Sequence, residues 1–418
     1  MTVLPVPQTP TAPAGAARAW PWHQLPVHSP VALQAAWRSA RLGLGAGEDS
    51  RPRTRALVRV LYQADEAVLV GSGTQALTLA LRAAATTLGA GGGGGGPPVV
   101  ALPAYTCYDV ATAAVAVNAR VALYDVNPAT LGPDLASLMS TLAEGARIVV
   151  VAPLYGMPVD WDAIERCVEG CGALAIEDAA QGHGAFWRGR PLGSLARLSV
   201  LSFSRGKGWT AGRGGALLAR GNVRVVDGTP PECGSMGEVA VALTALAQSA
   251  LGRPGTYGLP AAIPWLHLGE TRYRDPEEPR AISRTAAALL ERTLPLATRE
   301  AEARRANATA LLVRLRSRAG ARTFLPPPGA TPGYLRLPVR LPHGLDALVD
   351  RNLARRVGVA AGYPSTLAAL PQVRQRLVRA GRWPGAEELV RQLVTLPTHS
   401  LVSAADREGL LSLLDRVA

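Results

Sequence analysis

The chain has 418 residues, of which 48% are hydrophobic and 18% are charged, and its formal net charge is +13. This length suits two or three packed units, and the apolar fraction is too high for a disordered chain. No stretch reaches the roughly 18 to 20 apolar residues of a membrane-spanning helix, and four cysteines in so long a chain exclude a disulfide framework. We therefore expect an enzyme-sized protein of the reducing cytoplasm.

Lys207 is the only lysine among the 44 basic side chains, and the others are arginines. The arginines are spread along the chain, which favours a solvated arginine-rich surface over a nucleic-acid-binding protein. A lysine that persists where arginine has replaced the others points to a need that a guanidinium cannot meet, such as an imine formed by a primary amine. Chance survival of a surface lysine is the alternative, and its position must decide.

In chain order, residues 1–25 form a Pro- and Ala-rich tail without a secretory signal pattern, and residues 89–98 form a flexible Gly-rich insertion. An apolar run and a glycine turn predict a strand at 67–70 and a buried helix at 75–87. Strands and helices then alternate, with strands at 99–102, 120–126, 147–153, 173–177, 198–203 and 215–218, and helices at 106–118, 134–144, 161–171 and from about 238. Such alternation predicts an α/β fold with a mostly parallel sheet.

The alternation of strands and helices ends near residue 280. The pattern predicts amphipathic helices at 281–294 and 299–319, a strand pair near 334–340 and a last helix at 404–417. We expect a large domain over residues 26–275 and a smaller C-terminal α+β domain over residues 276–418.

Several chemically active residues fall where predicted strands end, at the edge of a parallel sheet that carries function. Ser72-Gly73-Thr74 precedes a helix, so its amides and hydroxyls can hold a phosphate, although an ordinary helix cap is the alternative. Gly71-x-Gly73-x-x-Ala76 also fits a dinucleotide fingerprint, but the glycine run replaces the acidic residue expected ~20 positions later.

Asp178 ends a buried strand, where a carboxylate needs a cationic partner such as a pyridinium nitrogen. The strand at 198–203 leads into Lys207, which glycines flank, and Tyr105 and Tyr108 follow the strand at 99–102. A phosphate cradle, an anion, an amine and an aromatic stacking surface are the requirements of pyridoxal phosphate.

These motifs resemble the DegT/DnrJ/EryC1/StrS family of pyridoxal-phosphate-dependent sugar aminotransferases, which have the aspartate aminotransferase fold, fold type I. The most specific segments are Glu177-Asp178-Ala179-Ala180-Gln181-x-His183-Gly184 to Gly193-Ser194, and Ser202-Phe203 to Lys207. Weaker matches extend from Leu25-Pro26-Val27 to Leu396-Pro397, over most of the chain. The resemblance implies a three-layer large domain and a homodimer with its active sites at the subunit interface.

The resemblance also implies roles for individual residues. Lys207 would hold the cofactor and then act as the base and acid of the proton shift, and Asp178 would keep the ring nitrogen protonated. Gln181 would contact the ring face or its hydroxyl, and Ser202 would bind the phosphate with the glycine turn. The candidate cofactor-binding residues are therefore Ser72, Gly73, Thr74, Tyr105, Cys107, Tyr108, Asp178, Gln181, Ser202 and Lys207.

The sequence departs from the family pattern at several positions near the site. Cys107 stands where a large aromatic residue usually stacks on the cofactor, so Tyr105 or Tyr108 would stack instead. Gly208 replaces the usual Asn after the lysine, and Arg213 replaces an acidic residue. The Gly-Tyr-Asn-x-Arg-Met segment that reaches the partner's cofactor has only a distant counterpart at residues 271–274. These changes weaken the inference to a typical nucleotide-linked 4-keto sugar.

Three further residues are candidate substrate contacts: His183, Trp209 and Arg213. His183 is about equally suited to stabilising a turn, and Trp209 to anchoring the lysine loop. The remaining histidines lack metal-ligand spacing, so we expect no metal.

We therefore expect an aminotransferase that moves an amino group from a donor such as glutamate onto a keto sugar, nucleotide-linked in the usual case, or a keto cyclitol. Arginines are suited to the donor carboxylate or to a substrate diphosphate, and the sequence leaves open which ones bind it. One alternative is a catalytically silent regulatory or binding protein, because residues beside Lys207 are altered. The other is a dehydratase, but dehydrating members usually replace the lysine with histidine.

Overall fold

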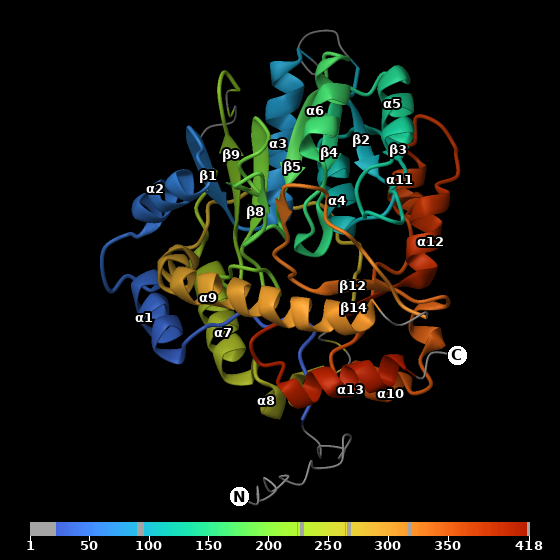
Figure 1. Cartoon of the computed structure of the whole chain (residues 1–418). Helices are drawn as coiled ribbons and strands as arrows, with labels where there is room; N and C mark the ends of the chain where they lie inside the picture. Colours follow the sequence, from blue (N-terminus) through green and yellow to red (C-terminus); the bar gives the residue numbers. More distant parts are fainter. Residues whose placement is uncertain are drawn as a thin grey trace, which may run out of the picture.

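The computed structural model describes residues 22–89, 96–223, 225, 230–263, 265, 269–316 and 320–415. Nearly all of the expected tail and most of the Gly-rich insertion lie outside these residues. A large sheet with helices on both faces occupies one end of the molecule, and a smaller sheet with short helices lies at the other (Figure 1). Within the described ranges no helix is both long and apolar enough to cross a membrane.

The large sheet has seven strands. Their spatial order is β1 (Glu66–Val70), β9 (Gly215–Ala219), β8 (Leu198–Ser202), β5 (Leu174–Asp178), β4 (Ile148–Val151), β2 (Val99–Pro103) and β3 (Arg120–Tyr124). Only β9 runs antiparallel to its neighbours, so the prediction of a mostly parallel sheet is confirmed. The carboxyl ends of β1, β5 and β8 therefore meet at one edge.

Strand residues alternate between two apolar cores. Ile148 and Val150 face one core, whereas Val149 and Val151 face the other, as the two-residue period of a strand requires. The first core includes α3 (Gly73–Thr87) and α4 (Tyr108–Ala116), and the second includes α5 (Leu135–Ala143) and α6 (Trp161–Glu169). These four helices match the predicted ones to within a few residues.

The sequence predicted two helices over 281–319, and this prediction was wrong. A single helix, α9 (Arg284–Leu315), runs through Pro295 without ending. Proline removes one backbone donor, but buried residues on both sides, Thr293 and Ala297, fix the helix against its neighbours. Packing along its length thus outweighs the local cost of the proline.

Two helices with no counterpart in the prediction, α1 (Leu33–Gly43) and α2 (Arg51–Leu61), pack on α9. The helical region predicted from about residue 238 is confirmed: α7 (Ser235–Leu251) also packs on α9, and the short α8 (Pro254–Ala261) packs on α7. Three two-residue strands, β6 (Phe186–Trp187), β7 (Arg190–Pro191) and β11 (Ala330–Thr331), form a small separate sheet.

The C-terminal part is an α+β unit, as expected. Its antiparallel sheet has the order β10 (Arg322–Thr323), β12 (Leu337–Arg340), β14 (Leu393–Leu396) and β13 (Ala360–Ala361). Its helices are α10 (Arg351–Arg356), α11 (Pro371–Arg374), α12 (Pro384–Gln392) and α13 (Ala404–Leu414). Because α9 packs both on α1 and on α13, the exact division at residue 275 stays a prediction.

Candidate active site

The turn between β1 and α3 forms a cradle of backbone donors. Ser72 caps α3, and its Oγ accepts the N–H of Gln75 at 3.2 Å. Gly73 and Thr74 are the first residues of the helix, so their N–H groups have no carbonyl partner within it. A Cβ at Gly73 would lie 2.7 Å from the Cβ of Ser202 and 3.0 Å from its Oγ. Glycine therefore lets the positive end of α3 approach the hydroxyl at the end of β8.

Asp178 ends β5 as a half-buried carboxylate. Its Oδ1 accepts the N–H of Ala180 at 3.1 Å, and no salt bridge joins it to a described residue. Burial raises the pKa of Asp178, and the nearby charge of Asp109 raises it further. The charge of Lys207 and the hydrogen bond from the Ala180 N–H oppose this rise. The second carboxylate oxygen is thus available to a cationic N–H, the partner that the sequence led us to expect.

The residue before Asp178 faces the opposite side of the sheet. The fully buried carboxylate of Glu177 accepts the N–H groups of Gly193 and Leu195 at 2.7 and 2.9 Å, and the hydroxyl of Ser199 at 3.0 Å. Burial raises the pKa of Glu177, and these hydrogen bonds oppose the rise. Glu177 therefore fixes the end of β5 and leaves Asp178 free for chemistry.

Lys207 lies in the loop that follows β8. Its backbone carbonyl accepts the hydroxyl of Ser29 at 2.6 Å, which ties the loop to the N-terminal segment. A Cβ at Gly208 would lie 2.8 Å from the Cβ of His183, so an Asn would not fit without a shift. The ammonium of Lys207 forms no salt bridge with any residue in the described ranges, and it interacts electrostatically with Asp178 and Cys107.

Cys107 precedes α4 and lies beside these two groups. Burial, with Asp109 and Asp178, raises the pKa of its thiol to about 12, although Lys207 lowers it. The thiol is therefore neutral at physiological pH. The side chain occupies the edge at which a stacking residue was expected.

The hydroxyls of Tyr105 and Tyr108 are engaged with the C-terminal unit. Tyr105 Oη accepts the N–H of Tyr363 at 2.9 Å, and Tyr108 Oη shares a 2.6 Å hydrogen bond with Ser365 Oγ. Both side chains are almost completely buried. Stacking of either ring on a cofactor stays a prediction, and Cys107 is the neighbour that interacts with both Lys207 and Asp178.

Tyr363 is a site residue that the sequence did not single out. Gln181 Nε2 donates to its hydroxyl at 2.8 Å, while Gln181 Oε1 accepts the N–H of Tyr155 at 2.7 Å. Tyr363 also interacts electrostatically with Cys107 and Asp178. It comes from the loop after β13, so the C-terminal unit supplies one wall of the site. A lone Tyr between a glycine and a proline gives no sequence signal of this position.

The three predicted substrate contacts are placed differently from one another. His183 Nδ1 shares a 3.2 Å hydrogen bond with Tyr62 Oη, and burial together with two nearby arginines lowers its pKa to about 3. Trp209 is 1% exposed, and its Nε1 donates to the carbonyl of Leu290, so it anchors the lysine loop in the interior. Arg213 is exposed. A contact of any of them with substrate stays a prediction.

These residues fit pyridoxal phosphate as a group. The first turn of α3 and Ser202 suit a phosphate, and one oxygen of Asp178, which has no partner in the described ranges, suits a protonated ring nitrogen. Lys207 offers a primary amine without a salt bridge to a described residue. The arrangement can therefore hold the cofactor and place one acid-base group beside it.

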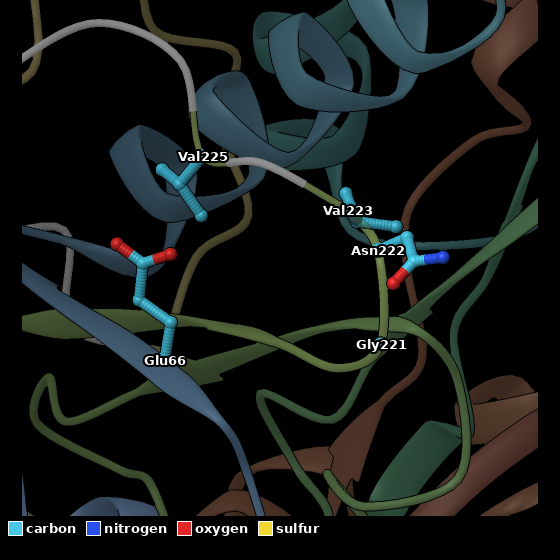
Figure 2. Close-up of a pocket in the computed structure, with 5 residues that line it drawn as sticks. All are labelled: Glu66, Gly221, Asn222, Val223 and Val225. Carbon is cyan, nitrogen blue, oxygen red and sulfur yellow. The ribbon is translucent and has the colours of Figure 1, made fainter.

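A hollow in the surface lies away from these residues. Figure 2 shows Glu66, Gly221, Asn222, Val223 and Val225 around it. Glu66 begins β1, so this hollow is at the edge of the sheet opposite to Ser72. Its described lining offers a single carboxylate and no nucleophile or cation, so it carries no chemistry comparable to that around Lys207.

Comparison with known proteins identifies the family that the chain resembles. The model of the DegT/DnrJ/EryC1/StrS aminotransferase family matches residues 47–223. An L-glutamine:2-deoxy-scyllo-inosose aminotransferase of Streptomyces fradiae is 29% identical, and the match covers 93% of this chain and 92% of that protein. One of the same description from Streptomyces paromomycinus is 30% identical over 86% of this chain and 80% of that protein.

Solved structures show the same fold. DesV of S. venezuelae matches with a TM-score of 0.69 and 22% identity, over 93% of this chain and 98% of that one. A Streptococcus pneumoniae protein described as a sugar aminotransferase, solved in its PLP form, matches with a TM-score of 0.70 and 18% identity over 94% and 98% of the two chains.

Proposed function

The chain belongs to the DegT/DnrJ/EryC1/StrS aminotransferase family and is a pyridoxal-phosphate-dependent aminotransferase, and we propose that it transfers the amino group of L-glutamine onto a keto cyclitol of the inosose type. The observation that carries the proposal is the likeness, over nearly the whole of both chains, to an enzyme described as acting on those two substrates. The departures from the family pattern near Lys207 agree with an acceptor other than a typical nucleotide-linked sugar. L-Glutamine thus replaces the glutamate that the sequence led us to expect.

Within this proposal, pyridoxal phosphate supplies an electron sink for the negative charge that develops on the substrate carbon. Lys207 would hold the cofactor through Nζ. Its amine would then act as the base that removes the proton from the donor α-carbon in the first half-reaction and as the acid that gives a proton to the acceptor carbon in the second. Asp178 keeps the ring nitrogen protonated through its unpaired oxygen. Gln181 spans Tyr155 and Tyr363 and thereby fixes the wall of the site.

The phosphate cradle leads to a first prediction. We expect Gly73→Ala to weaken binding of pyridoxal phosphate by at least about tenfold. The new Cβ would lie 2.7 Å from the Cβ of Ser202 and would push the first turn of α3 away from the Ser202 hydroxyl, with which it would hold the phosphate. Fluorescence titration of the apoprotein with the cofactor measures this. Gly409→Ala, at a glycine of α13 with open space around it and no left-handed backbone, is the control and should bind normally. Equal affinity in both variants would contradict the cradle.

We also propose that the enzyme is a homodimer of the cytoplasm. Met236 and Leu243 of α7 and Leu259 of α8 are exposed apolar side chains, 86%, 62% and 43% exposed, on neighbouring helices. A second copy of the chain is the partner we propose for them, and light scattering in solution tests it.

The four cysteines are free, which supports a reducing compartment.

The test of the function uses isotope transfer. The holoenzyme is incubated with L-glutamine carrying ¹⁵N on its α-amino group and with 2-deoxy-scyllo-inosose, and the cyclitol is analysed by mass spectrometry. We expect ¹⁵N in the cyclitol. Transfer only to a nucleotide-linked 4-keto sugar would overturn the proposed acceptor, and transfer only from glutamate would overturn the donor. No transfer between any of these pairs would support the silent alternative.

A further inference from the structure

Arg336 is a largely buried cation that has no anionic partner among the described residues. Among the described residues, its Nη2 makes two long contacts, to the carbonyls of Gly358 at 3.5 Å and Thr395 at 3.4 Å, and its buried Nε has no hydrogen-bond partner there. Arg340 at the end of the adjoining strand β12 differs, since it pairs with Glu388 and Gln392. A buried guanidinium without an anion costs folding free energy, so we expect an anion from outside the chain to bind beside Arg336.

Within the part of the chain that the structure describes, the side chains that interact with this guanidinium are tyrosines. Tyr155, Tyr257 and Tyr363 interact with it electrostatically, and burial lowers the pKa of Arg336 to about 10. The pKa of Tyr155 is itself raised to about 12 by burial, so Tyr155 is neutral at physiological pH. Neutral hydroxyls can donate to an anion but cannot replace it.

The tyrosines that interact with Arg336 also interact with residues of the candidate active site. Tyr363 receives a hydrogen bond from Gln181 and interacts with Asp178 and Cys107. On another side Tyr257 interacts with Arg205, two residues before Lys207. An anion held by Arg336 would therefore lie next to the groups that perform the transfer.

We propose that Arg336 binds the α-carboxylate of the amino donor and that this carboxylate is the missing counterion. The inference rests on the proposed function, because it assigns one substrate group to the same site. A carboxylate matches the planar fork of a guanidinium, and both half-reactions use one site in which a keto cyclitol carries no charge. A single guanidinium beside neutral tyrosines suits one carboxylate, whereas a diphosphate would need a second cation such as Arg205 at the same place.

Two unreactive probes test the proposal by binding alone. 4-Carbamoylbutanoate is L-glutamine without its amino group, and pentanediamide is the same molecule with the carboxylate replaced by an amide. Isothermal titration of the holoenzyme should show the carboxylate binding at least about tenfold more tightly than the diamide. Arg336→Gln should bring this ratio close to one, and Arg340→Gln, whose arginine already has a carboxylate partner, should keep it.

Arg336→Lys is the second variant, in case the glutamine variant does not fold. It keeps the charge but loses the fork, so we expect a partial loss of the ratio and a raised KM for L-glutamine with kcat nearly unchanged. An unchanged ratio in a folded Arg336 variant with a normal cofactor spectrum would overturn the inference, and so would weaker binding of UDP with an unchanged ratio. A wild-type enzyme that binds cofactor but transfers no amino group would overturn the proposed function instead.

Discussion

Replacing Lys207 by alanine is expected to lower kcat by at least about 10⁴-fold, because the change removes both the attachment point of the cofactor and the acid-base group of the reaction. No other lysine can take over, since the chain has only this one. Borohydride reduction of the holoenzyme, followed by peptide mass mapping, provides a direct readout. We expect the reduced cofactor on the peptide that contains Lys207 in the wild type, and no adduct in Lys207→Ala.

Two further variants separate chemistry from charge. Lys207→Arg keeps the positive charge beside Asp178 but should be as inactive as the alanine variant. Adding Arg205→Lys to Lys207→Ala places an amine two residues away and should not restore activity, because the loop around Lys207 is fixed by Ser29 and by the packing of Gly208 on His183. An adduct on any other residue of the wild type would show that the lysine was assigned the wrong role.

The large sheet could be predicted from the sequence because its signals are local. The period of two in strands and the glycine turn after β1 are visible within short windows, and a parallel sheet then brings the carboxyl ends of β1, β5 and β8 to one edge. Asp178 and Lys207 were therefore recognisable as neighbours although 29 positions separate their numbers.

The C-terminal contribution to the site could not be predicted in this way. Tyr363 and Arg336 are isolated residues more than 120 positions beyond Lys207, and only contacts between the C-terminal unit and the large domain, such as that of Tyr363 with Gln181, bring them to the site. Which of the residues expected near the cofactor ring stacks on it stays open for a different reason. Tyr105, Cys107 and Tyr108 lie within four residues, and orientation, which sequence does not give, sends the tyrosine hydroxyls to residues 363 and 365.

Asp178→Asn is expected to lower kcat by about 10²- to 10³-fold, the usual effect of removing one electrostatic stabiliser in an active site. Asparagine cannot hold a proton on the ring nitrogen, so charge on the substrate carbon is less well stabilised. Steady-state kinetics with L-glutamine measure the loss. Asp109→Asn is the matched control: Asp109 adds to the pKa shift of Asp178 without a place in the proposed machinery, and we expect its kcat to stay within about twofold of wild type.

The same substitution should stabilise the protein without cofactor. Burial raises the pKa of Asp178 above its unfolded value, so the folded state binds a proton more readily than the unfolded state. Ionised Asp178 therefore costs stability above its folded pKa, and that cost disappears as the pH falls below the unfolded pKa of about 3.9. We expect apo Asp178→Asn to melt on the order of 1 to 3 °C higher than the wild type at pH 8, with the difference shrinking toward pH 4. Adding pyridoxal phosphate should reverse the order, because only the wild type gains a pyridinium partner. An apo Asp178→Asn variant that melts lower than the wild type at pH 8 would mean that the ionised carboxylate stabilises the protein without cofactor, and would contradict the prediction.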